Sequence, residues 1–273
     1  APDSVVIDKI QGHIEFKNVH FRYEEDVPVL KDINLDTKPN QRVAFVGFTG
    51  AGKTTLVSLL SRFYDPNEGK ILIDGVDLKK ISLKSLRSQM GIVLQDTYLF
   101  SGTVMENIRY GRPSATDDEV FAAAKKVGAH EFIMKLMDGY DTQVRERGSL
   151  LSLGQRQLIS FSRALLADPR ILILDEATSS VDPYTELKIQ EALETLLQGR
   201  NSFIIAHRLS TILNSDIICV IEDGEIIQKG PHEELVTEDG LYKHLYEMQF
   251  SKSDTQTIDE LKDQLMKQYK TSS

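Results

Sequence analysis

Residues 42–60 read "RVAFVGFTGAGKTTLVSLL", and three patterns follow one another in this segment. The first, "RVAFV", is an apolar run that predicts a buried strand. Glycines then come at three of the next six positions, and from Lys53 onward the apolar residues have helical spacing. The apolar face expected for this helix consists of Leu56, Leu59, Leu60 and Phe63. The segment therefore predicts a strand, a glycine-rich loop and a helix in succession.

The loop fits the pattern G-x-x-x-x-G-K-[ST], from Gly47 to Thr54. Glycines let backbone N–H groups approach a phosphate without clashes from Cβ atoms, and the start of the helix adds its positive dipole end. In such a loop Lys53 reaches the β- and γ-phosphates and Thr54 is a ligand of Mg²⁺. Because a strand precedes the loop and a helix follows it, we interpret this segment as a phosphate-binding loop rather than an ordinary turn.

A second carboxylate site is expected beside a phosphate-binding loop, and "ILILDE" (residues 171–176) supplies it. Four apolar residues predict a central strand, whose C-terminal end faces the nucleotide crevice of an α/β sheet. Asp175 would then bind Mg²⁺ directly or through water, and Glu176 would polarise the attacking water as a general base. Two acidic residues after a strand are a weak signal alone and a strong one beside this loop.

Composition narrows the class of protein. The chain has 273 residues, 41% of them hydrophobic, and a formal net charge of −9, which argues against a broad nucleic-acid footprint. The single cysteine, Cys219, lies in the apolar run "DIICVI" and is expected to be a buried small side chain. No apolar stretch reaches the length of a membrane-spanning helix. We expect a soluble chain, and a first residue other than Met suggests processing or a fragment of a longer protein.

The rest of the chain alternates strands with helices, which predicts a mostly parallel sheet. Residues 14–23 alternate apolar and polar side chains with a phase slip at Lys17–Asn18, as in one bulged strand or two strand pieces. Residues 117–167 are helical in character and form an expected insertion. The tail from Ser251 is polar and then helical, and it either docks on its own domain or makes a dimer contact.

Further motifs resemble those of one family, the nucleotide-binding domains of ATP-binding cassette (ABC) transporters, over about residues 12–250. The motifs carrying the resemblance are Tyr23, Gln95, "LSLGQ" (151–155), "SSVD" (179–182) and "AHR" (206–208). The resemblance implies an α/β fold: a P-loop NTPase (RecA-like) core with a mostly parallel sheet, an N-terminal antiparallel β-subdomain and a helical subdomain at about 96–167. Residues 1–11 would be a linker from a missing transmembrane domain, and residues 251–273 a C-terminal tail helix.

The resemblance also implies ATP and Mg²⁺ as ligands, with Tyr23 stacking on adenine. It assigns catalytic roles to Lys53, Gln95, Glu176 and His207. It assigns nucleotide contacts to Tyr23, Thr49, Gly50, Ala51, Gly52, Lys53, Thr54, Thr55, Ser152, Gly154, Gln155 and Asp182. It assigns Mg²⁺ contacts to Thr54, Gln95 and Asp175. Ser152 and Gly154 would act on the nucleotide of an opposite subunit, so that two domains enclose two ATP molecules.

The segments "GTVMENIRYG" (102–111), "TQVRERG" (142–148) and "QKGPHEEL" (228–235) resemble the exporter subgroup, so the implied function is an ATPase motor at the cytoplasmic face of the cell membrane. An importer ATPase is the alternative. Leu153 stands where the family signature has glycine, and its side chain would limit the approach to a γ-phosphate and disfavour positive φ. With Glu176 and His207 retained, the altered signature favours a heterodimer over a homodimer. The acidic net charge argues for no nucleic-acid partner.

Overall fold

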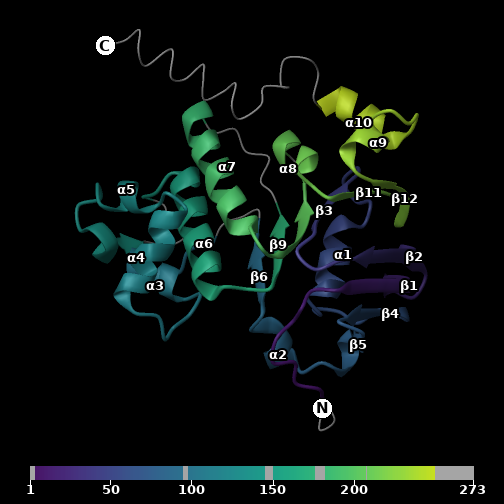
Figure 1. Ribbon diagram of the computed structural model, residues 1–273, viewed down its shortest axis with the longest axis horizontal. Coiled ribbons are helices and arrows are strands. Elements are labelled where there is room, and N and C mark those ends of the chain that lie inside the picture. The colour runs from purple at the N-terminus through teal and green to yellow at the C-terminus, as the bar shows by residue number, and fades with distance from the viewer. Residues whose placement is uncertain (1–3, 95–97, 145–149, 176–181, 207, 250–273) are drawn as a thin grey trace. The chain divides into compact units, whose positions relative to one another are not determined.

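The computed structural model describes residues 4–94, 98–144, 150–175, 182–206 and 208–249 (Figure 1). These residues form two compact units. Unit 1 takes the residues up to 91, residues 170–175 and those from 199 onward. Unit 2 takes residues 92–169 and 182–198.

The larger sheet of unit 1 has the strand order β12-β11-β3-β10-β9-β6. Its strands are β3 (Arg42–Val46), β6 (Met90–Val93), β9 (Ile171–Asp175), β10 (Asn201–Ile205), β11 (Ile217–Glu222) and β12 (Glu225–Gly230). The pairs β11–β3, β3–β10 and β10–β9 are parallel, and the hairpin pair β11–β12 is antiparallel. The neighbouring strands β3, β10 and β9 therefore end at one edge, which carries Gly47 and Asp175.

The second sheet of unit 1 is antiparallel, with the order β2-β1-β4-β5 that can be followed in Figure 1. Its strands are β1 (Ile14–Glu24), β2 (Val27–Thr37), β4 (Glu68–Ile73) and β5 (Val76–Asp77). The register of β1 against β2 shifts between Phe16 and Val19, and Asn18 has φ 47°. The sequence slip at Lys17–Asn18 is thus a β-bulge within one strand.

Helix α1 (Lys53–Leu60) packs its leucines into the core of unit 1, where Leu56, Leu59 and Leu60 are buried. The prediction for Phe63 was wrong, because the helix ends before it. Arg62 has φ 52°, a left-handed backbone angle at which the chain departs from the helix. Phe63 is 60% exposed. The other helices of unit 1 are α2 (Leu83–Arg87), α8 (Leu209–Leu213), α9 (His232–Leu235) and α10 (Leu241–Gln249).

Cys219 lies in β11 in the core of unit 1, as predicted. Burial raises the pKa of its thiol to about 12, because the thiolate would lose its hydration there. The side chain therefore acts as a small apolar residue rather than a reactive thiol.

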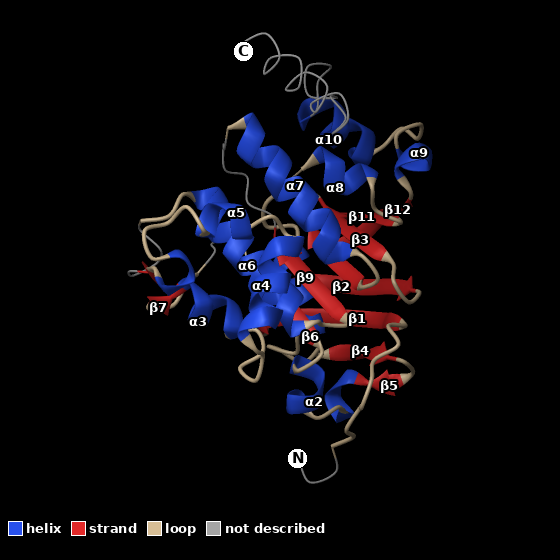
Figure 2. Cartoon of the chain, turned by 60° about the vertical axis from the view of Figure 1, so that its left-hand side comes forward, coloured by secondary structure: helices blue, strands red, loops and turns tan. Residues whose placement is uncertain are grey.

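Unit 2 consists mainly of helices, drawn in blue in Figure 2. They are α3 (Val104–Arg109), α4 (Asp117–Lys126), α5 (His130–Ile133), α6 (Leu153–Ala167) and α7 (Pro183–Leu197). Two short strands, β7 (Gly102–Thr103) and β8 (Gln143–Val144), pair beside them. Helix α6 packs against α3, α4 and α7. The structure thus groups α7 with the helical unit, although its sequence lies between two strands of the unit 1 sheet.

The fold class expected from the sequence is confirmed by the mostly parallel sheet, the separate antiparallel sheet and the helical unit. The N-terminal segment is hydrogen-bonded along unit 1. Ile7 N donates to Ser85 Oγ at 2.9 Å, and Ile10 N donates to Gln89 Oε1 at 2.7 Å. Its assignment as a linker stays a prediction, and the predicted tail helix lies outside the described residues.

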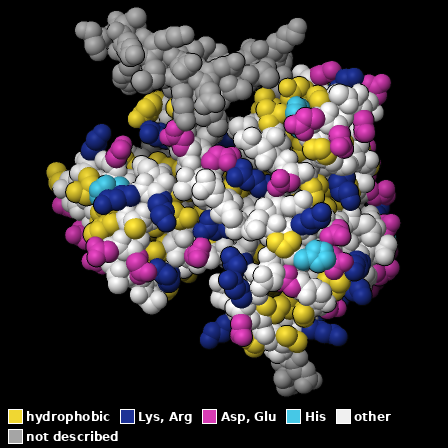
Figure 3. Space-filling model, in the orientation of Figure 1, with side chains coloured by type: hydrophobic (Ala, Val, Ile, Leu, Met, Phe, Trp, Pro, Cys, Tyr) yellow, Lys and Arg dark blue, Asp and Glu magenta, His cyan; other side chains and the backbone are white. Residues whose placement is uncertain are grey.

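Charged residues of both signs are interspersed over the face shown in Figure 3. None of the helices in the described ranges combines the length and the apolar character needed to cross a membrane.

Candidate nucleotide-binding site

The phosphate-binding loop leaves β3 at Gly47 and enters α1 at Lys53, as the sequence predicts. Gly47 has φ 146°, and a Cβ atom there would lie 2.2 Å from the carbonyl oxygen of Ile221. Gly52 has φ 108°, and a Cβ atom there would lie 2.7 Å from Leu30 Cδ2. Both positions therefore require glycine, for the backbone angle and for the space.

Backbone hydrogen bonds hold the loop in shape. Ala51 N donates to Phe48 O at 3.2 Å, which closes a turn within the loop. Gly224 N, in the turn between β11 and β12, donates to Ala51 O at 3.2 Å. Lys31 N on β2 in turn donates to Gly224 O at 2.8 Å. The loop is thus tied to both sheets of unit 1, and sequence reasoning did not single out Gly224 or Lys31.

Lys53 is buried, with 9% of its surface exposed. Its Nζ donates to the carbonyl oxygens of Gly47 at 2.7 Å and Phe48 at 2.8 Å. Burial lowers the pKa of Lys53 below its usual value, and the negative charge of Asp175 partly opposes that effect. The structure therefore places a cation against the inner side of the loop, with an acidic side chain close enough to affect it.

The oxygen-bearing residues near the loop suit a hard cation. Thr54 is exposed in the first turn of α1, and Asp175 is half-buried at the C-terminal end of β9. Hydroxyl and carboxylate oxygens are the ligands that Mg²⁺ takes from proteins. The two residues present therefore fit the ion, and Gln95, the third predicted Mg²⁺ contact, lies outside the described residues.

Tyr23 lies near the end of β1 and is 53% exposed. Its hydroxyl lies 3.3 Å from Thr55 Oγ1, and Thr55 is a buried residue of α1. This hydrogen bond connects the predicted adenine-stacking ring to the helix that follows the phosphate-binding loop. Thr49, Gly50, Ala51 and Thr54 lie in the loop or the first turn of α1, so unit 1 brings these predicted nucleotide contacts together.

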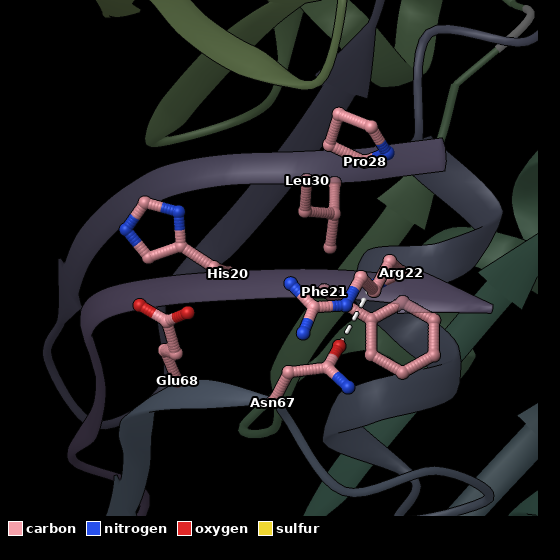
Figure 4. A pocket seen from close by; sticks show the side chains of 7 residues that line it. All are labelled: His20, Phe21, Arg22, Pro28, Leu30, Asn67 and Glu68. Carbon is pink, nitrogen blue, oxygen red and sulfur yellow. Dashed lines mark hydrogen bonds between the residues drawn. The ribbon is translucent and has the colours of Figure 1, made fainter. Parts of the chain in front are cut away.

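A small hollow opens on the antiparallel sheet of unit 1, lined in part by His20, Phe21 and Glu68 (Figure 4). Its volume is about 80 Å³. Ligand pockets are usually roughly 300–1,000 Å³, so this hollow is too small for a nucleotide. Asn67 Oδ1 accepts a hydrogen bond from Arg22 N at its rim, at 2.7 Å.

Unit 2 carries the residues predicted to act on an opposite nucleotide. Ser152 is the N-cap of α6, and its Oγ accepts from Gln155 N at 3.2 Å. Gln155 Oε1 accepts from Ser152 N at 2.9 Å, which completes a capping box. The spacing S-x-x-Q before an apolar run is a signal for this cap, in addition to the nucleotide role that the resemblance implies for both residues.

Leu153 is the first residue of α6 and does not have positive φ. This agrees with the expectation that a leucine side chain disfavours positive φ at this position, because the helix begins at this residue. The steric effect on a bound phosphate stays a prediction: an isobutyl group stands at the helix start, where glycine would leave the backbone accessible.

Gly154, the next residue, is buried in α6 and packs against α7. A Cβ atom at Gly154 would lie 2.3 Å from Thr185 Cγ2. Real Cβ atoms do not approach a neighbour so closely, so this glycine is needed for the packing of the two helices. Either the predicted nucleotide contact or this packing role can account for a glycine at position 154. The sequence indicated only the nucleotide contact.

Replacing Gly154 by alanine should destabilise the protein by about 1–3 kcal/mol through overpacking. Thermal unfolding would measure the loss. The double variant Gly154→Ala/Thr185→Ser should recover most of it, because serine keeps the hydroxyl of Thr185 and removes the methyl group that the new Cβ meets. The single Thr185→Ser variant is the control. A double variant no more stable than Gly154→Ala would contradict the packing explanation.

Asp182 is the N-cap of α7, and its Oδ1 accepts from Thr185 N at 3.0 Å. Hydrogen bonds from the Thr185 side chain and then its backbone hold the pKa of Asp182 below the usual value, so the residue is an exposed carboxylate. Its predicted nucleotide contact stays a prediction. The other predicted residues, Gln95, Glu176 and His207, lie outside the described residues.

These observations define the class of protein. A strand, a glycine-dependent loop, a helix start and a buried lysine follow one another in unit 1, in the arrangement expected of a phosphate-binding loop. An aspartate at the end of a parallel strand stands close to that lysine. This arrangement is typical of P-loop nucleotide-binding ATPases.

Comparison with known proteins narrows the class. The profile of the ABC transporter family matches residues 30–179. An uncharacterised ABC transporter ATP-binding protein of Bacillus subtilis is 54% identical over 250 residues, which are 92% of this chain and 41% of that relative. A Staphylococcus aureus protein, named as a multidrug export ATP-binding/permease protein, is 53% identical over 88% of this chain and 42% of its own length.

A solved structure agrees with the sequence comparisons. It is a bacterial Atm1-family ABC exporter with ATP bound, with 41% identity and a TM-score of 0.83. The match covers 92% of this chain and 45% of that one. The chain belongs to the ABC transporter family and is an ATP-binding domain of that family, a class of ATPases. It spans about two fifths of the length of the curated relatives it matches.

Proposed function

We propose that this chain is the ATP-hydrolysing motor domain of an ABC exporter. The observation that carries the proposal is the buried Lys53, whose Nζ lies against the carbonyl groups of Gly47 and Phe48 in a loop shaped by glycine. The names of the relatives support export, because they refer to multidrug export, and the solved neighbour is an exporter. They do not favour the importer alternative.

The residues of unit 1 divide the work of binding ATP. Backbone N–H groups of the loop from Thr49 to Gly52, apart from that of Ala51, which donates to Phe48 O, face the β- and γ-phosphates, while Lys53 neutralises their charge. Thr55 and Tyr23 hold the α-phosphate side and the adenine. Thr54 and Asp175, with Gln95, would hold Mg²⁺, which supplies charge neutralisation across the phosphate oxygens when it is bound.

Hydrolysis needs a base and a contact to the γ-phosphate. Glu176 accepts a hydrogen bond from the attacking water and draws its proton, and His207 reaches the γ-phosphate. The water oxygen attacks the γ-phosphorus, the bond to the β-phosphate oxygen breaks, and ADP and inorganic phosphate leave. These two assignments rest on the resemblance of "LDE" and "AHR" to the family motifs.

The signature residues Ser152, Gly154 and Gln155, with Asp182, would act on a nucleotide bound by a second domain, in a head-to-tail pair. We favour a heterodimer, because Leu153 puts a bulky side chain at the start of α6. Glu176 would then work opposite the intact signature of the partner. The transmembrane domains of the transporter are the other partners, which places the domain at the cytoplasmic face of the membrane.

The test is hydrolysis of ATP by the chain, measured as release of inorganic phosphate. We expect steady turnover with Mg²⁺ and a fall to background when EDTA removes the metal, because the phosphate charge is then not neutralised. Turnover should return when Mg²⁺ is added in excess of the chelator. If the chain binds ATP but does not hydrolyse it with Mg²⁺ present, either alone or mixed with a candidate partner domain, the motor proposal is contradicted.

A further inference from the structure

Three aromatic rings meet beside the proposed adenine position in unit 1: Phe21, Tyr23 and Tyr64. The centroids of Tyr23 and Phe21 are 4.8 Å apart with an interplanar angle of 88°. Those of Tyr23 and Tyr64 are 5.1 Å apart at 86°. Phe21 and Tyr64 complete the triangle at 5.6 Å. Both contacts of Tyr23 are edge-to-face, the arrangement that aromatic pairs prefer.

Phe21 is buried, whereas Tyr64 is 48% exposed. Phe21 therefore belongs to the core, and its contact with Tyr23 is explained by packing. Tyr64 has no such explanation, because about half of its side chain faces solvent. Its ring nevertheless lies against Tyr23, a residue that is 41 positions away in the sequence.

The backbone that carries Tyr64 is firmly held. Arg62, at φ 52°, donates from its guanidinium to the carbonyl oxygens of Ile81 and Lys79. Its Nε also pairs with Asp65 Oδ1 at 3.2 Å. Hydrogen bonds and an ion pair therefore hold the turn after α1 on both sides of Tyr64, at Arg62 and at Asp65. These contacts fix the backbone from which the Tyr64 ring extends.

The ring of Tyr23 is held by fewer contacts than the backbone around Tyr64. It is 53% exposed near the end of a strand, and its hydroxyl is held by Thr55 at 3.3 Å. One hydrogen bond at the far end of the ring does not fix the rotation of the ring plane. Phe21 contacts the ring from the core side, and contact with Tyr64 restricts it from the solvent side before a ligand arrives. Pre-organised side chains lose less entropy on binding.

We propose that Tyr64 is a positioning residue for nucleotide binding: it holds the ring of Tyr23 in the orientation that accepts the base. This inference rests on the proposed function, in which Tyr23 stacks on adenine. It predicts that Tyr64 contributes to the part of the affinity that comes from the base and contributes nothing to the part that comes from the phosphates.

The test compares two ligands, ATP and inorganic triphosphate, by calorimetry with Mg²⁺ present. Tyr64→Ala should weaken ATP binding about 3- to 10-fold, the scale of one edge-to-face aromatic pair, and leave the affinity for triphosphate unchanged. Tyr64→Phe should bind ATP like the unsubstituted chain, since it keeps the ring. A double variant with Tyr23→Ala should bind ATP as Tyr23→Ala alone does, because Tyr64 acts through Tyr23.

Phe63→Ala is the matched control. Phe63 is the preceding residue, it is 60% exposed, and its ring lies under Arg87 at 5.4 Å. We expect both affinities to stay unchanged in this variant. An equal loss for ATP and triphosphate in Tyr64→Ala, a loss that adds in full to that of Tyr23→Ala, or no loss would overturn the inference.

The two proposals fail in different ways. If Tyr23→Ala leaves ATP affinity unchanged while the chain still hydrolyses ATP, the positioning role of Tyr64 is overturned and the motor function stands. If the unsubstituted chain binds neither ATP nor triphosphate, the proposed function itself fails, and the inference with it.

Discussion

Replacing Lys53 by alanine should reduce ATP hydrolysis about 100- to 1,000-fold, the scale seen when one pre-organised donor to a developing charge is removed. The structure adds a second reason. Nζ also bridges the carbonyl oxygens of Gly47 and Phe48, so the alanine variant loses two bonds that shape the loop. Phosphate release measures the effect, and ATP affinity should fall with it.

Lys79→Ala is the control for this variant. Its Nζ also donates to a backbone carbonyl, that of Pro66 at 2.9 Å, so the substitution removes the same charge and the same kind of bond elsewhere in unit 1. Hydrolysis should be unchanged. Equal losses in the two variants would show that the effect of Lys53 is one of general charge or stability, and would count against its role at the phosphates.

Replacing Glu176 by glutamine should reduce hydrolysis about 100- to 10,000-fold, the range that general bases contribute. Binding of ATP should persist, because the amide keeps the shape of the side chain and removes only its basicity. Glu225→Gln, on β12, is the control and should hydrolyse ATP normally. Normal turnover in Glu176→Gln would contradict the assignment of this residue as the base.

The Glu176→Gln variant also tests the proposed heterodimer, because we expect it to bind ATP without consuming it. Light scattering with ATP should report a monomer, since Leu153 stands at the start of α6 in both copies. Adding Leu153→Gly should shift the mass toward a dimer. A dimer of Glu176→Gln alone would show that two leucine signatures close over ATP, and would favour a homodimer.

The sequence was sufficient for much of the candidate site. The strand, loop and helix around Gly47–Lys53 and the burial of Cys219 follow from patterns among neighbouring residues, and the structure confirms them. The phase slip at Lys17–Asn18 left a bulged strand or two strand pieces open, and the structure shows the bulge. Backbone angles, periodicity and short hydrogen bonds act over a few positions, so a local pattern contains the information for them. The capping box of Ser152 and Gln155 is of the same kind, although it was not foreseen.

Other features depended on residues far apart in the chain. The end of α1 put Phe63 in solvent and Tyr64 against Tyr23, which no periodicity predicted. The steric demand on Gly154 comes from a methyl group of Thr185 on another helix. Such contacts exist only after strands and helices have packed, because side chains distant in sequence then share one surface. The local sequence thus predicted the phosphate-binding loop and its class of chemistry, while the packed fold assigned distant partners to Tyr23 and Gly154.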